Sequence, residues 1–385
     1  MFPPKPPKGA DPRMYFFLFL LTLGTTLGYQ GWTLLYTNFA VESAHLSAAD
    51  NGLVQSLREV PGLLGFLIIP LLLVMKEHRV AAVAALATGL GTALTGFFPS
   101  FVPVILTTLL MSFGFHFFEA VNQSLLLQYF DVRTTPVVMG KLRGLAASVF
   151  VFFCSDFLPY TMMFLIVGAL CMFTGVWGLF LDPTNKELPI QSKKMVFRRK
   201  YWLFYLLTLF LGARRQIFIV FALFLLVEHF RFSVNTVSVL FMINYAINWF
   251  LNPLIGRTIN RIGERKLLSI EYSTAILVFT GYATTGSAWV AGVLYVIDYI
   301  VFNFSIALRT FFQKIAEPQD IAPTMAVAQT INHIAAIFVP ALGGWLWVEF
   351  GYQIPFFIGA ALSGCSLLLV QIIDREIRLH APAKA

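Results

Sequence analysis

The sequence has 385 residues, of which 58% are hydrophobic and 12% are charged, and its mean hydropathy is +0.77. A soluble domain of this length could not bury so much apolar surface, so the composition excludes an ordinary water-soluble fold and favours a bilayer. The net charge of +8 does not indicate nucleic-acid binding, because the Lys and Arg residues gather at alternate loops, at helix ends and in the two tails. That distribution follows the positive-inside rule, and it excludes nucleic acid as a partner.

The first apolar segment follows a short basic tail. Lys5, Lys8 and Arg13 precede an apolar run from Met14 to about Phe39. That run is longer than the core of a signal peptide and lacks a convincing cleavage site, so we interpret it as a membrane span that the protein keeps.

Twelve segments have the length and apolarity of membrane-spanning helices, since a bilayer core of about 30 Å requires about 20 apolar residues per helix. They lie near residues 14–38, 50–75, 79–98, 101–129, 135–157, 160–181, 201–228, 232–256, 266–285, 288–314, 321–348 and 353–374. The sequence therefore predicts an all-α integral membrane protein with 12 transmembrane helices.

The basic residues predict how these helices are oriented. The turn Lys76–Arg79, the stretch Arg133–Arg143 and the turn Arg257–Lys266 are basic, whereas Phe39–Asp50 and Asp156–Pro159 contain neither Lys nor Arg. Basic loops are retained in the cytoplasm. With an even number of spans, the N- and C-termini are therefore both expected to be cytoplasmic.

A polar linker divides the chain into two halves of six predicted spans each. We expect an N-terminal six-helix bundle over residues 1–181, a cytoplasmic linker over residues 182–200 and a C-terminal six-helix bundle over residues 201–385. A shift of 186 residues superposes Gln30 on Gln216 and produces further matches in the second and fifth spans. One offset that serves several spans favours two bundles built as parallel repeats.

The turn after the eighth predicted span carries a pattern of glycine, amide and basic residues. It resembles the signature loop of the major facilitator superfamily, which has a Gly, three residues, an Asp or Asn, a basic residue, a Gly and a basic cluster. The matching residues are Gly256, Asn260, Arg261, Gly263, Arg265 and Lys266. The equivalent loop of the first half is eroded, with Pro70 where Gly is expected.

This resemblance implies a secondary transporter that works by alternating access. In that family the substrate site lies near the middle of the membrane between the two bundles and is lined mainly by spans 1, 4, 7 and 10. Ionisable residues inside spans are costly, and they therefore mark candidate functional positions.

Span 4 places four polar residues on one helical face. They are Ser112, His116, Glu119 and Gln123. An imidazole and a carboxylate together can exchange a proton near neutral pH, so we expect His116 and Glu119 to serve proton coupling or gating. The alternative is a hydrogen-bonded pair that only joins two helices. A metal site is not expected, because the spacing offers no third ligand.

Span 7 carries Arg214 and Arg215 at its centre. Neighbouring residues point about 100° apart on a helix, so one guanidinium is expected to face the substrate cavity and the other a neighbouring helix. The planar guanidinium suits carboxylate, phosphate or sulfonate groups, which favours an anionic substrate. The alternative is that the arginines neutralise Glu59, Glu119 or Asp298.

The charges embedded in the spans also favour an anion, because one positive charge is left over. The count includes four arginines and three carboxylates. The arginines are Arg58, Arg214, Arg215 and Arg309, and the carboxylates are Glu59, Glu119 and Asp298. Arg58 and Glu59 in span 2 are equally consistent with substrate contact and with an ion pair across the interface of the two halves. In span 10, Asp298 and Arg309 are too far apart along the helix to pair, so each needs a partner elsewhere or water, and we expect both in gating networks.

Uncharged or weakly basic polar residues add candidates for substrate binding. They are Tyr29 and Gln30 in span 1, Asn244 and Asn248 in span 8, and Asn332 and His333 in span 11. The alternative for each is a role in helix association, which polar side chains often serve in membranes.

The sequence lacks the common motifs of enzymes. It has no Walker-type phosphate loop, GxSxG motif, HExxH motif or zinc-spaced cluster, and Cys154, Cys171 and Cys365 have no paired spacing. We therefore expect no enzymatic activity, no cofactor and no bound metal, and solute or ion gradients would drive transport.

The sequence thus favours a secondary active transporter of a small organic anion, with symport or antiport of protons left open. We expect a monomer surrounded by membrane lipids, in a bacterial inner membrane. The alternatives are an exporter of lipophilic, drug-like or lipid compounds and a membrane assembly or sensor protein that transports nothing. An enzyme acting on lipid-linked substrates is disfavoured, because large loops outside the membrane are missing.

Overall fold

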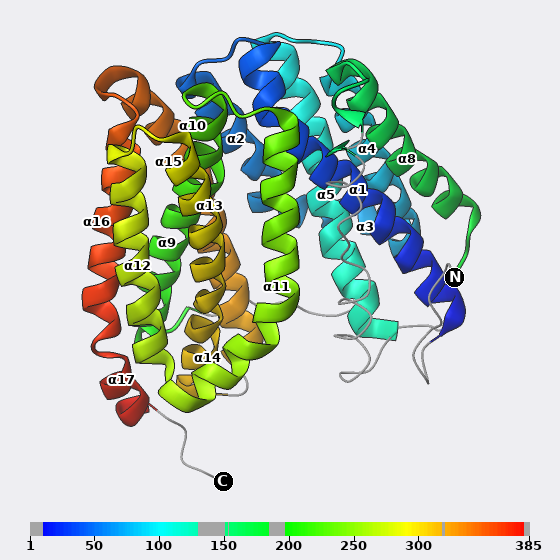
Figure 1. Cartoon of the computed structure of the whole chain (residues 1–385). Coiled ribbons are helices and arrows are strands. Elements are labelled where there is room, and N and C mark those ends of the chain that lie inside the picture. The colour runs from blue at the N-terminus through cyan, green and yellow to red at the C-terminus, as the bar shows by residue number, and fades with distance from the viewer. Residues whose placement is uncertain (1–10, 130–150, 153, 185–196, 318–319, 381–385) are drawn as a thin grey trace. The chain divides into compact units, whose positions relative to one another are not determined.

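The structure, a computed structural model, describes residues 11–129, 151–152, 154–184, 197–317 and 320–380 (Figure 1). Every regular element in these ranges is helical. The first half contains α1 (Pro12–Glu42), α2 (Ala48–Leu63), α3 (Ile68–Val74), α4 (Glu77–Thr95), α5 (Phe101–Tyr129) and α8 (Tyr160–Phe180). The second half contains α9 (Trp202–Gln216), α10 (Leu223–Glu228), α11 (Val234–Ile262), α12 (Glu264–Thr284), α13 (Ala288–Phe302), α14 (Ile306–Ile315), α15 (Ile321–Phe350), α16 (Gln353–Val370) and α17 (Ile373–His380).

Six stretches among the described residues are long and apolar enough to cross a membrane. They are Phe101–Asn122, Tyr160–Phe180, Arg199–Glu228, Ala288–Ile315, Val327–Phe350 and Gln353–Val370. All six coincide with predicted spans, and α1, α4 and α12 also lie where spans were predicted. The fifth predicted span, 135–157, lies mostly outside the described residues. The all-helical prediction is confirmed for the described ranges, and the total of twelve spans stays a prediction.

Three of the predicted spans are interrupted helices. The second divides into α2, a 3₁₀ turn at Gly65–Leu67 and α3, and Pro61 stands inside α2. A π-helical segment, Ile217–Ala222, joins α9 to α10, and a 3₁₀ turn at Asn303–Ser305 joins α13 to α14. Proline removes a backbone hydrogen bond, and π and 3₁₀ segments inside helices often mark functional positions.

The stretch that resembles the family's signature loop is mostly helical. The predicted span ends at Gly256, but α11 continues to Ile262, and α12 begins at Glu264. The turn is confined to Gly263, whose φ of 81° lies in the left-handed region that favours glycine. A boundary based on apolar length stops at the edge of the bilayer, whereas the helix itself continues past Gly256 and ends only at Ile262, directly before Gly263.

The contacts between helices divide the chain into two compact units. Unit 1 comprises Met1–Leu46, Leu57–Ile190 and Ser233–Val239, and unit 2 comprises Ser47–Ser56, Gln191–Phe232 and Leu240–Ala385. In unit 1, α4 packs against α5 and α8. In unit 2, α12 packs against α16, and α15 packs against α9.

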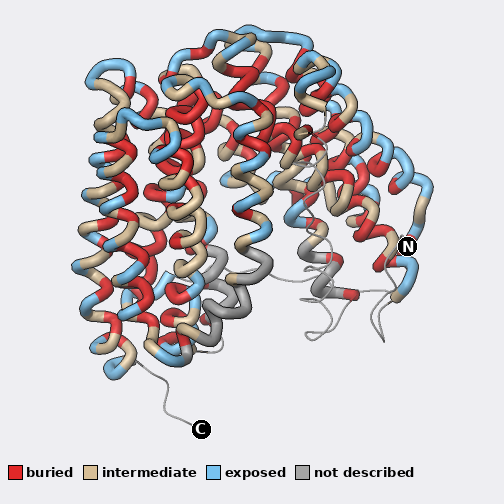
Figure 2. Tube along the Cα trace, in the orientation of Figure 1, coloured by how far each residue is buried: buried red, intermediate tan, exposed pale blue. Residues whose placement is uncertain are grey.

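Buried and exposed positions alternate along the helices of each unit, as expected where one face meets its neighbours (Figure 2). Small residues allow close contact between spans, since a Cβ on Gly168 of α8 would lie 2.5 Å from the Gly89 carbonyl oxygen of α4. Large apolar side chains remain outside: Phe180, Leu277 and Trp289 are 85%, 73% and 77% exposed. Such a surface is unfavourable in water and matches the hydrocarbon of a bilayer.

A cluster of ion pairs anchors the segment that enters α9 in unit 2. Asp320, directly before α15, is 2% exposed and accepts a hydrogen bond from the Tyr201 hydroxyl at 2.8 Å. Arg198 Nε lies 2.7 Å from the same carboxylate, and Lys200 pairs with Glu317. Burial by itself would raise the pKa of Asp320, but the hydrogen bonds from Tyr201 and Arg198 outweigh burial and lower this pKa.

We expect Asp320→Asn to lower the midpoint of thermal unfolding at neutral pH. A carboxylate whose pKa is lowered by folding stabilises the fold above its unfolded pKa of about 3.9, and this stabilisation is lost as the pH falls further. The difference in midpoint between the wild type and D320N should therefore shrink below about pH 4. Unfolding of the detergent-solubilised proteins across this pH range measures the difference.

Asp374→Asn provides the control for this substitution. Asp374 pairs with Arg265 at 2.9 Å, but the two side chains are 45% and 40% exposed. Exposed ion pairs contribute little, so D374N should change the midpoint much less. A D320N effect that persists undiminished at low pH would contradict the role of the ionised carboxylate.

Candidate functional site

Unit 2 contains a buried group of three charged side chains from three helices. Arg214 of α9 lies 2.6 Å from Glu271 of α12 and 3.7 Å from Asp298 of α13. The three side chains are 2%, 0% and 1% exposed. We call them the charged triad. Two carboxylates share one guanidinium, so the triad has an excess of negative charge when both carboxylates are ionised.

Aromatic rings adjoin the triad. The guanidinium carbon of Arg214 lies 5.9 Å from the ring centre of Tyr272 and 5.4 Å from that of Phe302. Within the described residues, Glu271 Oε2 and both carboxylate oxygens of Asp298 have no hydrogen-bond partner. Buried carboxylate oxygens without donors are costly. One bound proton would neutralise the triad and would also supply a donor.

Two of the interrupted helices position members of the triad. Arg214 lies near the end of α9, just before the π-helical segment Ile217–Ala222. Asp298 lies in the last turns of α13, just before the 3₁₀ turn at Asn303–Ser305. Glu271 comes from α12, which is continuous. A change of backbone geometry at either interruption would therefore move one partner relative to Glu271.

Glu271 is not among the candidate residues predicted from the sequence. It could have been included, because it is an ionisable residue inside the ninth predicted span. When Glu271 is counted, the embedded arginines and carboxylates are equal in number, so the predicted excess of one positive charge is wrong. The expectation that Asp298 pairs outside its own helix is confirmed by its contact with Arg214.

The two adjacent arginines of α9 have opposite environments. Arg214 is buried against α12 and α13, whereas Arg215 is exposed. The prediction that one guanidinium faces neighbouring helices is confirmed for Arg214. Arg309 of α14 is exposed as well, and neither Arg215 nor Arg309 forms an ion pair with another described residue. Substrate contact by Arg215 and gating by Arg309 stay predictions.

Unit 1 holds a second buried charge, on α2. Arg58 is 4% exposed, lies 2.7 Å from Glu59 and accepts a hydrogen bond on its carbonyl oxygen from the Ser112 hydroxyl of α5. Its guanidinium carbon lies 5.8 Å from the Trp32 ring of α1, which stacks on Tyr36 at 4.4 Å. Arg58 and Glu59 form an ion pair between neighbouring residues of one helix. The predicted pair between the two halves, and substrate contact or gating by these residues, stay predictions.

The polar face of α5 is half-buried. The Tyr29 ring of α1 stacks on Phe115 at 3.8 Å, and Phe115 meets the His116 ring edge-on at 5.5 Å. Glu119 is exposed, and Gln123 belongs to the same helix, but its side chain lies outside the described residues. No group of three or more His, Cys, Asp or Glu that could hold a metal occurs among the described residues.

The other candidate residues lie in several environments. Asn244 is 1% exposed, and neither polar atom of its amide has a hydrogen-bond partner among the described residues. His333 Nε2 lies 3.1 Å from Gln329 Nε2 on α15, one helical turn away. A Cβ on Gly212 would lie 2.7 Å from Asn332 Oδ1, so Asn332 packs directly on α9. Gln30 is half-buried on α1.

Two charged residues of the signature stretch form ion pairs within unit 2. Glu264, at the start of α12, pairs with Lys314 of α14 at 2.7 Å, and Arg265 pairs with Asp374 of α17. Arg261 and Lys266 are exposed. Gly256, Asn260 and Asn248 belong to α11, but their side-chain environments lie outside the described residues.

The comparisons with known proteins all indicate transporters. The profile of the Major Facilitator Superfamily matches residues 18–340, whereas no curated protein sequence matches the chain. The nucleoside transporter NupG shares the fold at a TM-score of 0.73 and 17% identity, over 95% of this chain and 99% of that one. A bacterial homologue of the human lysosomal transporter Spinster, in an inward-facing and unoccupied conformation, has a TM-score of 0.78 at 15% identity, over 98% and 100%.

A bacterial metal transporter also shares the fold, with a TM-score of 0.69 at 11% identity, over 95% and 99% of the two chains. Identities this low show the fold alone, whereas the family profile spans most of the sequence. Transport of a small molecule across a membrane, rather than enzymatic catalysis, is the function that this family implies. The chain is a multi-pass membrane protein that belongs to the major facilitator superfamily.

Proposed function

We propose that the chain is a proton-coupled secondary transporter of a small organic anion that works by alternating access. The observation that carries this proposal is the charged triad, in which two carboxylates share the guanidinium of Arg214. Arg214 and Asp298 lie in candidate membrane spans, and Glu271 lies beside them on α12. Binding of one proton relieves the excess negative charge. A site that gains and loses a proton as interrupted helices change conformation couples transport to a proton gradient.

The proposed contact with the anion is Arg215. It occupies a candidate span, is exposed within its unit and forms no ion pair with another described residue. A guanidinium exposed to hydrocarbon costs several kcal/mol, so we place Arg215 in a hydrated path. Its planar fork of donors binds a carboxylate, phosphate or sulfonate at two points.

The remaining sequence candidates complete the proposal. Tyr29 and Gln30 on α1, Asn244 and Asn248 on α11, and Asn332 and His333 on α15 would line the solute path. His116 and Glu119 would form a second place for proton exchange, and Arg58, Glu59 and Arg309 would serve gating. Polar side chains at these positions support such roles, because each is costly in a membrane unless it is paired or hydrated.

We also propose twelve spans with both termini in the cytoplasm, a monomeric state and a bacterial inner membrane as the location. The alternation of basic and non-basic loops supports the orientation. Basic segments of this kind are the turn at Lys76–Arg79 and the end of α11, whereas the loops before α2 and α8 contain no Lys or Arg.

We expect small carboxylates to raise the thermal unfolding midpoint of the purified protein, and Arg215→Gln to abolish that increase. A ligand that binds only the folded state stabilises it according to its concentration relative to Kd. Lactate, succinate, citrate and phosphate serve as anionic probes, and uridine serves as the neutral comparison. The screen is run at pH 5.5 and at pH 8, because proton coupling makes binding of the anion depend on pH.

Arg13→Gln is the matched control, since Arg13 is exposed at the start of α1, outside the candidate spans. It should respond to the same probe as the wild type. Stabilisation by uridine and by none of the anions would reject an anionic substrate. Stabilisation of R215Q as strong as that of the wild type would remove Arg215 from the binding site.

A further inference from the structure

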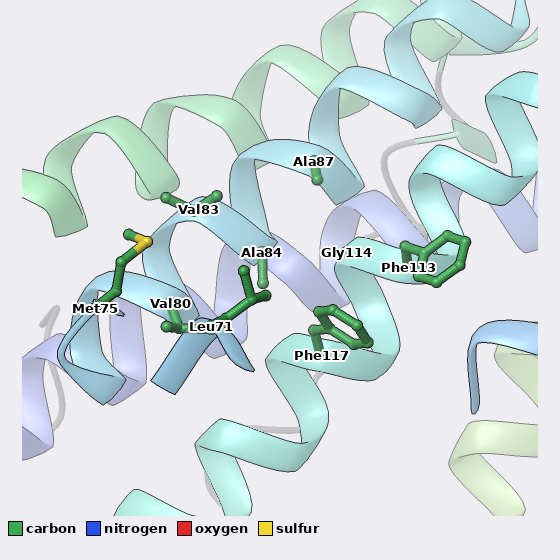
Figure 3. A pocket seen from close by; sticks show the side chains of 9 residues that line it. All are labelled: Leu71, Met75, Val80, Val83, Ala84, Ala87, Phe113, Gly114 and Phe117. Atoms are coloured by element: carbon green, nitrogen blue, oxygen red, sulfur yellow. The ribbon is translucent and has the colours of Figure 1, made fainter. Parts of the chain in front are cut away.

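A cavity of about 110 Å³ in unit 1 has an entirely apolar lining (Figure 3). It lies between α3, α4 and α5, with Met75, Ala87 and Phe117 among its lining residues. Apolar cavities of about 150 Å³ stay dry and bind apolar molecules, so this lining favours an apolar ligand. An apolar chain fits this space, whereas water or a polar solute does not.

The interrupted second span and a close contact between helices create the cavity. α2 ends at Leu63, and a Cβ on Gly65 would meet no atom within 4 Å, so the chain is loosely packed where it turns into α3. At Gly114, by contrast, a Cβ would lie 2.3 Å from the Thr88 amide nitrogen. α5 thus packs directly against the backbone of α4. α3 packs less closely against these two helices, and the cavity lies between the three.

The cavity opens to the outside of unit 1. Val83 lines it and is 43% exposed. Leu67 and Val74, on the interrupted span, are 39% and 78% exposed. Exposed apolar side chains favour hydrocarbon over water, so we expect the cavity to open toward the lipid.

A cationic side chain stands one turn from this opening. Arg79 precedes Val83 by one turn on the same face of α4, is exposed and forms no ion pair with another described residue. Its neighbour Lys76 is paired with Asp182 at 3.4 Å. Arg79 lies about 6 Å along the helix axis from Val83 and about 12 Å from Ala87. The interfacial layer of one leaflet is about 5–8 Å thick, so a headgroup at Arg79 places its acyl chain at the cavity.

We propose that the cavity and Arg79 form a binding site for one anionic phospholipid of the surrounding leaflet. One acyl chain enters between α3, α4 and α5, and the headgroup phosphate pairs with the Arg79 guanidinium. The lining contains no polar group that could hold a transported solute, and Arg79 supplies the charge that complements the headgroup. This site is independent of the charged triad and of the proposed anion contact.

The test is photolabelling of the full chain in phosphatidylcholine nanodiscs that contain phosphatidylglycerol with a diazirine near the middle of one acyl chain. Mass spectrometry should locate the label on Met75, Phe113 or Phe117. Ala87→Phe fills the cavity with a ring and should abolish this label. Val102→Phe is the matched control, because Val102 is 61% exposed at the other end of α5 and does not line the cavity.

Arg79→Gln should weaken the label about five-fold, the effect expected for one basic side chain at an anionic lipid surface, whereas Arg13→Gln should leave it unchanged. Ala87→Leu replaces A87F if unfolding curves show that A87F is misfolded. The proposal is overturned if A87F labels like the wild type, or if the label spreads evenly over exposed helices such as α8. Equal labelling by a zwitterionic phosphatidylcholine probe would overturn the selectivity for an anionic headgroup.

Discussion

Arg214→Met is expected to destabilise the protein by about 3–5 kcal/mol, because it leaves two buried carboxylates without a cation. Glu271 and Asp298 are 0% and 1% exposed, so water cannot replace the lost partner. Methionine has a length close to that of the apolar part of arginine, which limits the loss of packing. Thermal unfolding in detergent at neutral pH measures the change.

Removing the two unpaired carboxylates should restore most of the stability that Arg214→Met removes. In the triple variant R214M/E271Q/D298N all three side chains are uncharged, and uncharged replacements of buried ionic groups are often no less stable than the originals. Arg215→Met is the matched control, since Arg215 is the next residue of α9 but is exposed and forms no ion pair with another described residue. An equally large loss in R215M, or no recovery in the triple variant, would contradict the stabilising role of the ion pairs in the triad.

Glu271→Gln and Asp298→Asn are expected to separate solute movement from the proton gradient. Each amide resembles the protonated carboxyl group, so the triad is neutral and no longer binds or releases a proton. Accumulation of the solute against a gradient should fall to the level of simple equilibration, while exchange between equal concentrations continues. Proteoliposomes with an imposed pH difference measure the first activity, and counterflow of the same radiolabelled anion measures the second.

The carboxylate-to-amide change also needs a control outside the triad. Glu349 is exposed at the end of α15, and Glu349→Gln should leave both activities unchanged. If E271Q and D298N still concentrate the solute when driven by a pH difference, the triad is not the coupling site. His116→Gln, tested in the same assay, then shows whether α5 carries that role.

The helical elements could be predicted closely because their cause is local in the chain. Apolar length alone predicts spans at 101–129 and 160–181, and α5 and α8 match these bounds to within one residue. The 186-residue shift found in the sequence also aligns helix bounds, since it carries α1 onto Arg199–Glu228 and α5 onto Ala288–Ile315. The interruption at Ile217–Ala222 could not be predicted in this way, because it contains neither Pro nor Gly and its apolar composition continues unchanged into Leu223–Val227.

The candidate site was predicted only in part. The sequence marks Arg214 and Asp298 because a charge inside an apolar span is conspicuous wherever it occurs. Their partner Glu271 lies 57 residues from Arg214 along the chain, on a helix outside the four spans that the family resemblance emphasises. Only a folded bundle shows that these three side chains meet while Arg215, one residue away, does not join them.

The sequence by itself determined that this is an α-helical membrane protein of the major facilitator type, because composition, span length and loop charge act residue by residue along the chain. The tertiary structure decided which embedded charges neutralise one another, where the spans are interrupted and where α3 leaves an apolar cavity beside α4 and α5. These features depend on contacts between residues distant in sequence. Burial removes water from such contacts, so the neighbours that folding provides determine whether a charge is paired or exposed.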